Sequence, residues 1–208
     1  MQTGAHNRSV FAGINFCHCV DKVSVNPFGI TVPLDVGCTM FKVDGARFAV
    51  LPLPGHSAGH VGFVTPDGVA YVGDCLISQS EIDNAKLPTS MFIARDLESK
   101  AALRATDYPA YIIAHKQIIT DRAELSALID SNIAFIHRKE RELLDDLTDG
   151  MTFSDWIYAF CQRENIRTRQ ELKFSIVERN FTNFTDWLTD IGKVRVERDF
   201  CAKRYYRV

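Results

Sequence analysis

Apolar and polar residues alternate along two stretches in the first half of the chain. In residues 39–48 the alternation surrounds an Asp-Gly pair at 44–45, which favours a two-residue β-hairpin turn because both residue types tolerate positive φ angles. Residues 60–73 repeat the pattern around a Pro-Asp-Gly turn at 66–68. The pattern therefore predicts two consecutive β-hairpins.

The residues before these hairpins also have an extended character. An apolar run at 10–16 predicts a strand with no helix or helix cap before it. Residues 21–38 are rich in Pro, Gly and Val, and they predict a loop with short extended segments. The first predicted element is thus a strand of the kind found in hydrophobic cores.

Beyond residue 77 the spacing of apolar residues changes to the helical period. A helix is predicted at 96–107, before a Tyr-Pro pair that ends it, and a short buried strand is predicted at 111–115. Asp121 with Glu124 three residues later resembles a capping box, and a long amphipathic helix is predicted from there to about residue 149.

The last part of the chain predicts three helices and a terminal hairpin. Thr152 or Ser154 can cap a first helix, part of 169–179 predicts a second, and 184–191 predicts a third. Two alternating strands follow within 193–208. Three helices followed by a hairpin is the element order of a winged-helix module.

The length of 208 residues suffices for one core, or for one core and a small appended module. We predict an α/β (α+β) fold in two domains, residues 1–150 and residues 151–208. The formal net charge of -2 gives no general reason to expect nucleic acid or a membrane surface as partner. No signal-peptide pattern and no apolar run of about 18 residues occurs, so we expect a cytoplasmic protein without a membrane partner.

The predicted terminal hairpin is basic. Six basic residues stand against two acidic ones in residues 193–208. We favour a solvated hairpin that packs on the main domain or on a second chain over one that binds nucleic acid, because the helices before it are not basic.

Three short predicted strands end on potential metal ligands. His56 follows a Pro-Gly turn, Asp74 follows the strand at 69–73, and His115 ends the strand at 111–115. Because hairpin strands are neighbours, His56 and Asp74 can lie close together. Imidazole and carboxylate groups suit Zn, Fe or Mn, so the coincidence of three favours a divalent-metal site, although each residue alone is more often an ordinary polar residue.

Two further groups of residues belong to this hypothesis. His60 lies four residues after His56, which suits a hydrogen bond that orients a ligand better than direct coordination. The apolar loop at 84–92 is the best candidate to line a substrate pocket, through Leu87, Met91 and Phe92.

The stretch PGHSAGHVGFVTPDGVAYVGD, residues 54–74, resembles the PGHxxGHxGF to GD segment of the metallo-β-lactamase superfamily. That superfamily includes β-lactamases, glyoxalase II-type thioesterases, nucleases and diiron oxidoreductases. The resemblance implies an αββα sandwich, here a partial one. It also implies that His56 binds one metal, that Asp74 bridges two, and that His115 binds the second. Some branches carry helical tails of winged-helix type.

The sequence departs from the pattern of the superfamily in one important respect. Members of the superfamily carry the motif HxHxDH upstream of the PGH segment, and no HxHxDH occurs in these 208 residues. Residues 7–16 resemble the segment that ordinarily follows that motif. We therefore expect an N-terminally truncated hydrolase-like protein with weak or no activity by itself. Its Zn site, or Fe or Mn site, is expected to be absent or substoichiometric.

Two alternatives stay open. In the first, the chain is an active metal-dependent hydrolase of a small-molecule substrate, completed by a partner chain or by an upstream segment. A homodimer or a complementing chain would also cover the apolar sheet face and the unpaired edge that a partial sandwich exposes. In the second, the chain is a non-catalytic binding module that uses its basic terminal hairpin.

Overall fold

The computed structural model describes residues 39–114 and 117–208, and it groups residues 39–208 into one compact unit. The strand predicted at 10–16, the loop predicted at 21–38 and the predicted ligand His115 lie outside the described residues. None of the helices in the described part is long and apolar enough to cross a membrane.

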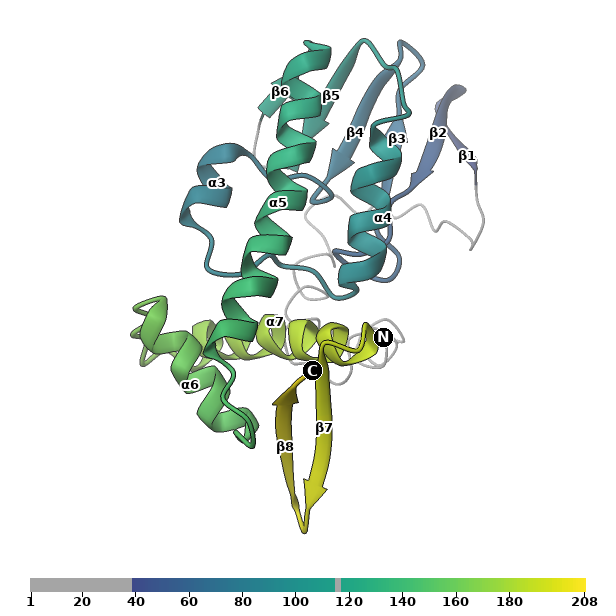
Figure 1. Cartoon of the computed structure of the whole chain (residues 1–208). Coiled ribbons are helices and arrows are strands. Elements are labelled where there is room, and N and C mark those ends of the chain that lie inside the picture. The colour runs from purple at the N-terminus through teal and green to yellow at the C-terminus, as the bar shows by residue number, and fades with distance from the viewer. Residues whose placement is uncertain (1–38, 115–116) are drawn as a thin grey trace. The chain divides into compact units, whose positions relative to one another are not determined.

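A six-stranded sheet forms the first layer of this unit, in the spatial order β1-β2-β3-β4-β5-β6 (Figure 1). Neighbouring strands are antiparallel except for β4 and β5, which run parallel and are joined through two helices. The strands are β1 (Met40–Val43), β2 (Ala46–Pro52), β3 (Val61–Val64), β4 (Val69–Gly73), β5 (Ala110–Ile113) and β6 (Gln117–Ile119).

Both predicted hairpins are confirmed, and their turns follow from the residues at the turn positions. Asp44 and Gly45 both have positive φ angles, 49° and 83°, as a tight turn between β1 and β2 requires. Between β3 and β4, Gly68 has a φ of 88°, and the Thr65 hydroxyl accepts a hydrogen bond from the Val69 amide at 2.9 Å. The register of these two hairpins is therefore set by local sequence.

Five helices are described: α3 (Gln79–Asn84), α4 (Ile93–Leu103), α5 (Arg122–Asp146), α6 (Phe153–Arg163) and α7 (Glu171–Asp190). The predicted bounds of α4 were wrong at both ends. It begins earlier because Ile93 is buried in the core, and it ends at Leu103 because the chain then tightens into turns through Arg104 and Thr106. The predicted N-cap of α5 is confirmed, since the Asp121 carboxylate accepts from the Glu124 amide at 2.8 Å.

The two helices predicted over 169–191 are one continuous helix, α7, so the prediction of two separate helices there was wrong. The residues between the predicted helices have modest helix propensity but include no Gly or Pro. Phe181 in that stretch is fully buried, and its packing stabilises the helix across these residues. Residues 151–208 thus hold two helices and a hairpin, and the likeness to a winged helix stays a prediction.

The buried hydrophobic residues form two clusters, one at each end of α5. The first fills the space between the sheet and the helices α4 and α5, which Figure 1 shows side by side across one face of the sheet. Its buried members are Leu53, Val64, Ala70, Val72, Cys75, Leu76, Leu103, Tyr111, Ile113, Ile119, Leu125, Leu128 and Ile129.

The second cluster joins the end of α5 to α6, α7 and the terminal hairpin. It also includes Leu87 and Ile93, so the segment before α4 packs on the C-terminal helices. The other buried members are Ile136, Leu143, Leu144, Leu147, Trp156, Ile157, Phe160, Phe181, Phe184, Trp187, Leu188, Val194 and Tyr205. The predicted domain boundary at residue 150 stays a prediction.

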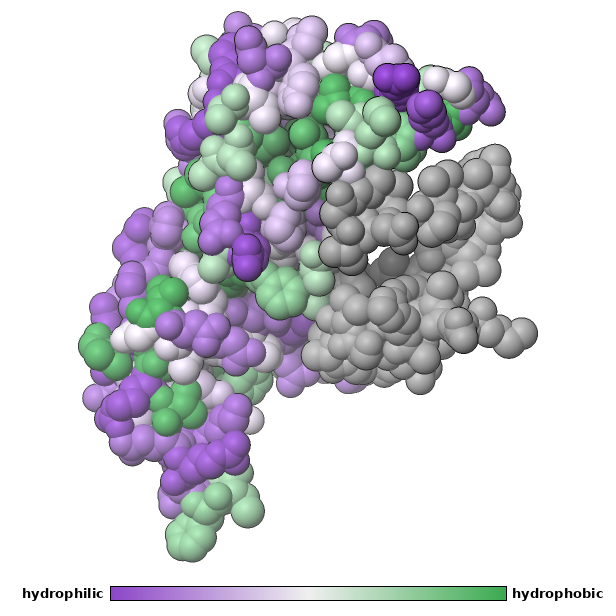
Figure 2. All heavy atoms as spheres, turned by 90° about the vertical axis from the view of Figure 1, so that its right-hand side faces the viewer, coloured by the Kyte–Doolittle hydropathy of each residue, from purple (hydrophilic) through white to green (hydrophobic). Residues whose placement is uncertain are grey.

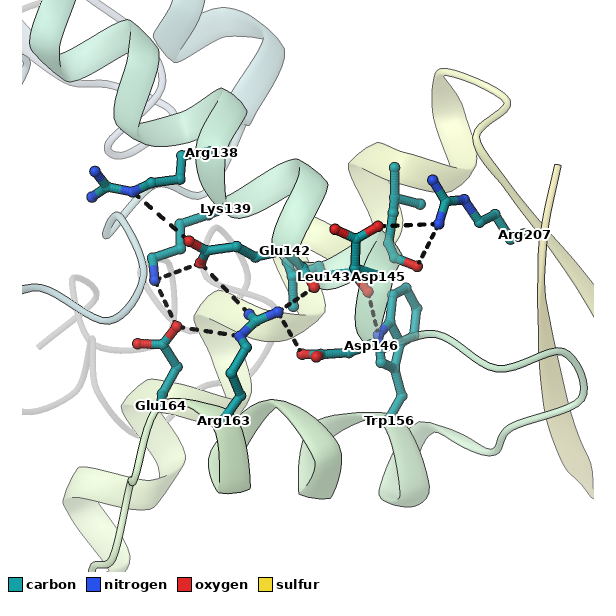
Figure 3. A network of polar contacts seen from close by, with 11 residues as sticks. Arg138, Lys139, Glu142, Leu143, Asp145, Asp146, Trp156, Arg163, Glu164 and Arg207 are labelled. Atoms are coloured by element: carbon teal, nitrogen blue, oxygen red, sulfur yellow. Dashed lines mark hydrogen bonds and ion pairs between the residues drawn. The ribbon is translucent and has the colours of Figure 1, made fainter.

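A polar network fixes α6 against α5 (Figure 3). The Arg163 guanidinium lies 3.0 Å from an Asp146 carboxylate oxygen and 3.6 Å from one of Glu142. Lys139 bridges Glu142 and Glu164 at 2.8 and 2.7 Å. Opposite charges on facing helices therefore complement the apolar contacts beneath them.

The terminal hairpin, β7 (Val194–Asp199) and β8 (Ala202–Arg207), extends away from the helices, and Figure 2 shows apolar atoms at its tip. The residue exposed there is Phe200, at 98%. Four of its basic residues form ion pairs with acidic residues of the same chain. The pairs are Lys193–Glu140, Arg195–Glu197, Arg204–Asp199 and Arg207–Asp145.

Candidate metal site

The structure brings His56 and Asp74 together at one end of the sheet. His56 lies in the turn between β2 and β3, and Asp74 directly follows β4. Since β2, β3 and β4 are neighbours, the His56 Nε2 atom and an Asp74 carboxylate oxygen are 3.7 Å apart. Both side chains are partly exposed, at 29% and 38%, so a small ligand can reach them.

The His56 ring is oriented by a backbone carbonyl. His56 Nδ1 lies 2.9 Å from the Thr89 carbonyl oxygen, which can only accept, so Nδ1 carries the proton. In the neutral ring the Nε2 lone pair is then on the side of Asp74, and their separation of 3.7 Å is too long for a hydrogen bond. A ligand histidine typically has this second hydrogen bond, and an imidazole facing a carboxylate fits Zn, Fe or Mn.

The turn that carries His56 is clamped against the start of α4. Gly55 has a φ of +145°, and a Cβ atom there would lie 2.3 Å from the Asp96 Cα atom. The Gly55 carbonyl accepts hydrogen bonds from the Met91 and Phe92 amides, at 2.9 and 3.0 Å, and from the Ser90 hydroxyl at 3.2 Å. Only glycine fits this conformation and this close approach, and the clamp fixes the backbone next to His56.

His60 is half-buried at the end of the same turn. Burial lowers the pKa of His60, although a hydrogen bond with the Leu53 carbonyl at 3.0 Å opposes the shift. Its Nε2 atom lies against Gly73, where an added Cβ atom would come within 2.9 Å. The ring stands edge-on to the His56 ring, with 5.6 Å between centroids. The predicted role of His60 in orienting a ligand stays a prediction.

A cavity of about 240 Å³ opens next to His56 and Asp74. Helix α3 supplies one wall, and with it Glu81, which the sequence analysis did not single out. The Glu81 carboxylate accepts from the Ser78 amide at 2.9 Å, so the Ser-x-x-Glu pattern at 78–81 was the signal available for it. The lining residues are His56, Asp74, Ile77, Glu81, Ala85, Leu87, Pro88 and Thr89.

Of the residues predicted to line a substrate pocket, Leu87 lines this cavity. Met91 and Phe92 do not, since their backbones bind Gly55 and the Phe92 side chain faces outward, 45% exposed. Their part in substrate binding stays a prediction. His115 is outside the described residues, so its role as a ligand also stays a prediction. Within 39–114 and 117–208 no group of three His, Cys, Asp or Glu side chains could hold a metal ion.

No protein-family model and no curated protein matches the chain. Solved structures do match it. A metallo-beta-lactamase family protein from Thermus thermophilus superposes with a TM-score of 0.63 at 19% identity, covering 100% of this chain and 64% of that one. A beta-lactamase domain protein from Burkholderia ambifaria gives a TM-score of 0.59 at 17% identity, covering 99% of this chain and 59% of that one.

These likenesses establish the fold. The chain has the mixed α/β fold of the metallo-β-lactamase superfamily, as the segment at 54–74 predicted. The chain spans less than two thirds of the length of either protein.

Proposed function

We propose that this chain carries part of a divalent-metal site of the hydrolase type, with His56, Asp74 and His115 as ligands and zinc as the first candidate metal. One observation carries the proposal: His56 Nε2 and an Asp74 oxygen face each other at 3.7 Å, while the Thr89 carbonyl fixes His56 Nδ1. Metal sites built from imidazole and carboxylate groups use this arrangement of ligand and supporting hydrogen bond.

A metal ion held there would supply Lewis-acid catalysis on a carbonyl or phosphoryl oxygen. The chain's own residues would position a small substrate in the cavity of about 240 Å³, whose wall combines Leu87 and Pro88 with polar groups. His56 and Asp74 would hold the metal ion beside the reacting end of the substrate, and the Thr89 carbonyl would keep the imidazole in one orientation.

The activity of these 208 residues by themselves is proposed to be weak. The sequence has no HxHxDH motif, so the ligands that this motif supplies in the superfamily are missing from this set. With few ligands, metal affinity falls, and the metal is expected at less than one ion per chain after purification. A partner chain that supplies further ligands would raise both affinity and activity.

Metal titration of the purified protein tests this proposal. We expect Zn²⁺ or Co²⁺ to bind the native chain, and His56→Ala or Asp74→Asn to weaken that binding by at least about tenfold. His137→Ala is the matched control, because His137 contacts Glu140 and Trp187 on another part of the fold. Equal metal affinity in the native chain and in both site variants would contradict the proposal.

Hydrolase assays on the same proteins test the level of activity. We expect the native chain with added Zn²⁺ to hydrolyse thioester, lactam and phosphodiester probes slowly or not at all. Rapid hydrolysis that disappears in His56→Ala would show that these residues suffice for catalysis and would contradict the proposal of weak activity.

A further inference from the structure

The segment that orients His56 is itself held by the C-terminal helix α7. Residues 89–92 make polar contacts in two directions, toward the turn of His56 and toward α7. Leu87 and Ile93, on either side of this segment, belong to the same hydrophobic cluster as Phe184 of α7. The segment is therefore packed against α7 as well as against the candidate metal site.

On the side of the metal site, the segment binds both the ring of His56 and the backbone of Gly55. The Thr89 carbonyl accepts a hydrogen bond from His56 Nδ1 at 2.9 Å. The Gly55 carbonyl accepts one from the Ser90 hydroxyl at 3.2 Å. A shift of the segment would therefore move the carbonyl that fixes the tautomer of His56.

On the other side, two asparagines of α7 donate to the segment. Asn183 Nδ2 donates to the Ser90 carbonyl at 2.8 Å, and Asn180 Nδ2 donates to the Thr89 hydroxyl at a longer distance, 3.4 Å. The two asparagines stand three residues apart, so they share one face of α7. Ser90 is only 2% exposed, so water has little access to replace a lost partner of its carbonyl.

We infer that Asn183 is a positioning residue, which holds His56 from the far side of this segment. The Asn183 amide fixes the Ser90 carbonyl, and the adjoining Thr89 carbonyl then keeps the proton of the imidazole on Nδ1. The Nε2 lone pair is left on the side of Asp74. The orientation of His56 does not rest on the proposed function, whereas its effect on metal affinity does.

The test is the ¹⁵N NMR spectrum of the histidine rings in metal-free protein at about pH 9, where histidine rings are neutral. The signals that disappear in His56→Ala identify the His56 ring. We expect one tautomer of this ring, protonated at Nδ1, in the native chain and signals of both tautomers in Asn183→Leu. A single Nδ1-protonated tautomer in Asn183→Leu, in a protein that its thermal transition shows to be folded, would overturn the inference.

Three further variants separate the role of the amide from a general loosening of α7. Asn183→Gln keeps the donor and is expected to retain the single tautomer. Asn183→Asp sets an acceptor against the Ser90 carbonyl and carries the same expectation as Asn183→Leu, so it replaces that variant if leucine prevents folding. Thr182→Ala is the matched control, because it removes a hydrogen bond within α7, to the Glu178 carbonyl. A mixture of tautomers in Thr182→Ala as well would overturn the inference.

Zn²⁺ titration of the same proteins measures the consequence for the metal site. We expect Asn183→Leu to weaken Zn²⁺ binding by at least about threefold, which is less than the loss in His56→Ala. The two proposals fail separately. The expected tautomers together with Zn²⁺ affinity that is unchanged in His56→Ala contradict the metal site alone. A single tautomer in Asn183→Leu together with weakened Zn²⁺ binding in His56→Ala contradicts the role of Asn183 alone.

Discussion

At the scale of single residues, the candidate site depends on a turn that only one residue type can form. Gly55 combines a φ of +145° with a backbone approach to Asp96 that leaves no room for a Cβ atom. Its carbonyl collects three hydrogen bonds from the segment 90–92. The backbone at His56 is therefore placed by the packing of this turn, while the Thr89 carbonyl orients the His56 ring.

A pair of glycine substitutions tests this dependence. Gly55→Ala is expected to destabilise the fold by about 2 kcal/mol or more, since it adds overlap with Asp96 to backbone strain. Gly59→Ala in the same turn is the control, because a Cβ atom there meets nothing within 4 Å. Urea denaturation measures both changes, and a similar loss in the two variants would show that the clamp does not hold the turn.

The residues near the candidate site differ in whether the sequence alone predicted them. His56 and Asp74 were predicted because glycines and strand ends mark them, and the structure brings them to 3.7 Å. Glu81 was not predicted, although the Ser-x-x-Glu capping pattern at 78–81 was a local signal for it, and Asn180 was not predicted, because its contact with Thr89 joins residues far apart in the sequence. Glu81 is placed by a short helix, and Asn180 is placed by α7 packing against Thr89, far away in the sequence.

The carboxyl group of Glu140 gives a prediction about pH. Burial by itself would raise the pKa of Glu140, but hydrogen bonds from His137 and Lys193 outweigh burial and lower it below the ordinary value of 4.5. A depressed carboxyl pKa means that this stabilisation is present above about pH 4.5 and is lost as pH falls through the folded-state pKa.

Replacement of Lys193, one of the two hydrogen-bond partners of Glu140, measures how much this contact stabilises the fold. Lys193→Ala is expected to lower the free energy of unfolding by about 1 kcal/mol at pH 7 and by clearly less at an acid pH below the folded-state pKa of Glu140. Lys173→Ala, at an exposed position on α7, is the control and should cost the same at both pH values. A loss in Lys193→Ala that does not change with pH would contradict this explanation.

At the scale of elements, long periodic segments were predictable and short or packing-dependent ones were not. Helix α5 was predicted from its cap and its apolar stripe, and both hairpins were predicted from their turn residues. The three-residue strand β6 and the six-residue helix α3 are too short for a period to be recognised. Helix α7 was split in the prediction because local propensity dips where tertiary packing, through Phe181, holds the helix together.

The contact between α5 and α6 gives a prediction at this scale. Arg163→Ala removes the cation that pairs with Asp146 and leaves Lys139 alone to pair with Glu142 and Glu164, so we expect a loss of about 2 kcal/mol in the free energy of unfolding. Arg95→Ala is the control, since the Arg95–Glu98 pair is exposed and should contribute less than about 0.5 kcal/mol. Thermal denaturation compares them, and equal stability of the two variants would contradict a structural role for the network in Figure 3.

At the scale of the whole molecule, the sequence predicted the fold class because one segment, 54–74, combines turn residues with potential ligands in a recognisable order. The fold is confirmed by two solved structures, each of which is longer than this chain. Association with a second chain stays a prediction, as does a cytoplasmic location. Light scattering at micromolar concentration would test the first, and a monomer would contradict it.

The central claim is that His56 and Asp74 bind the same metal ion, and a double-mutant cycle on Zn²⁺ affinity tests it most directly. The native chain is compared with His56→Ala, Asp74→Ala and the double variant. We predict that each single substitution weakens Zn²⁺ binding by at least about tenfold and that the double variant binds little more weakly than either one, because the two ligands share one site. Losses that simply add, or no loss in either single variant, would contradict the claim.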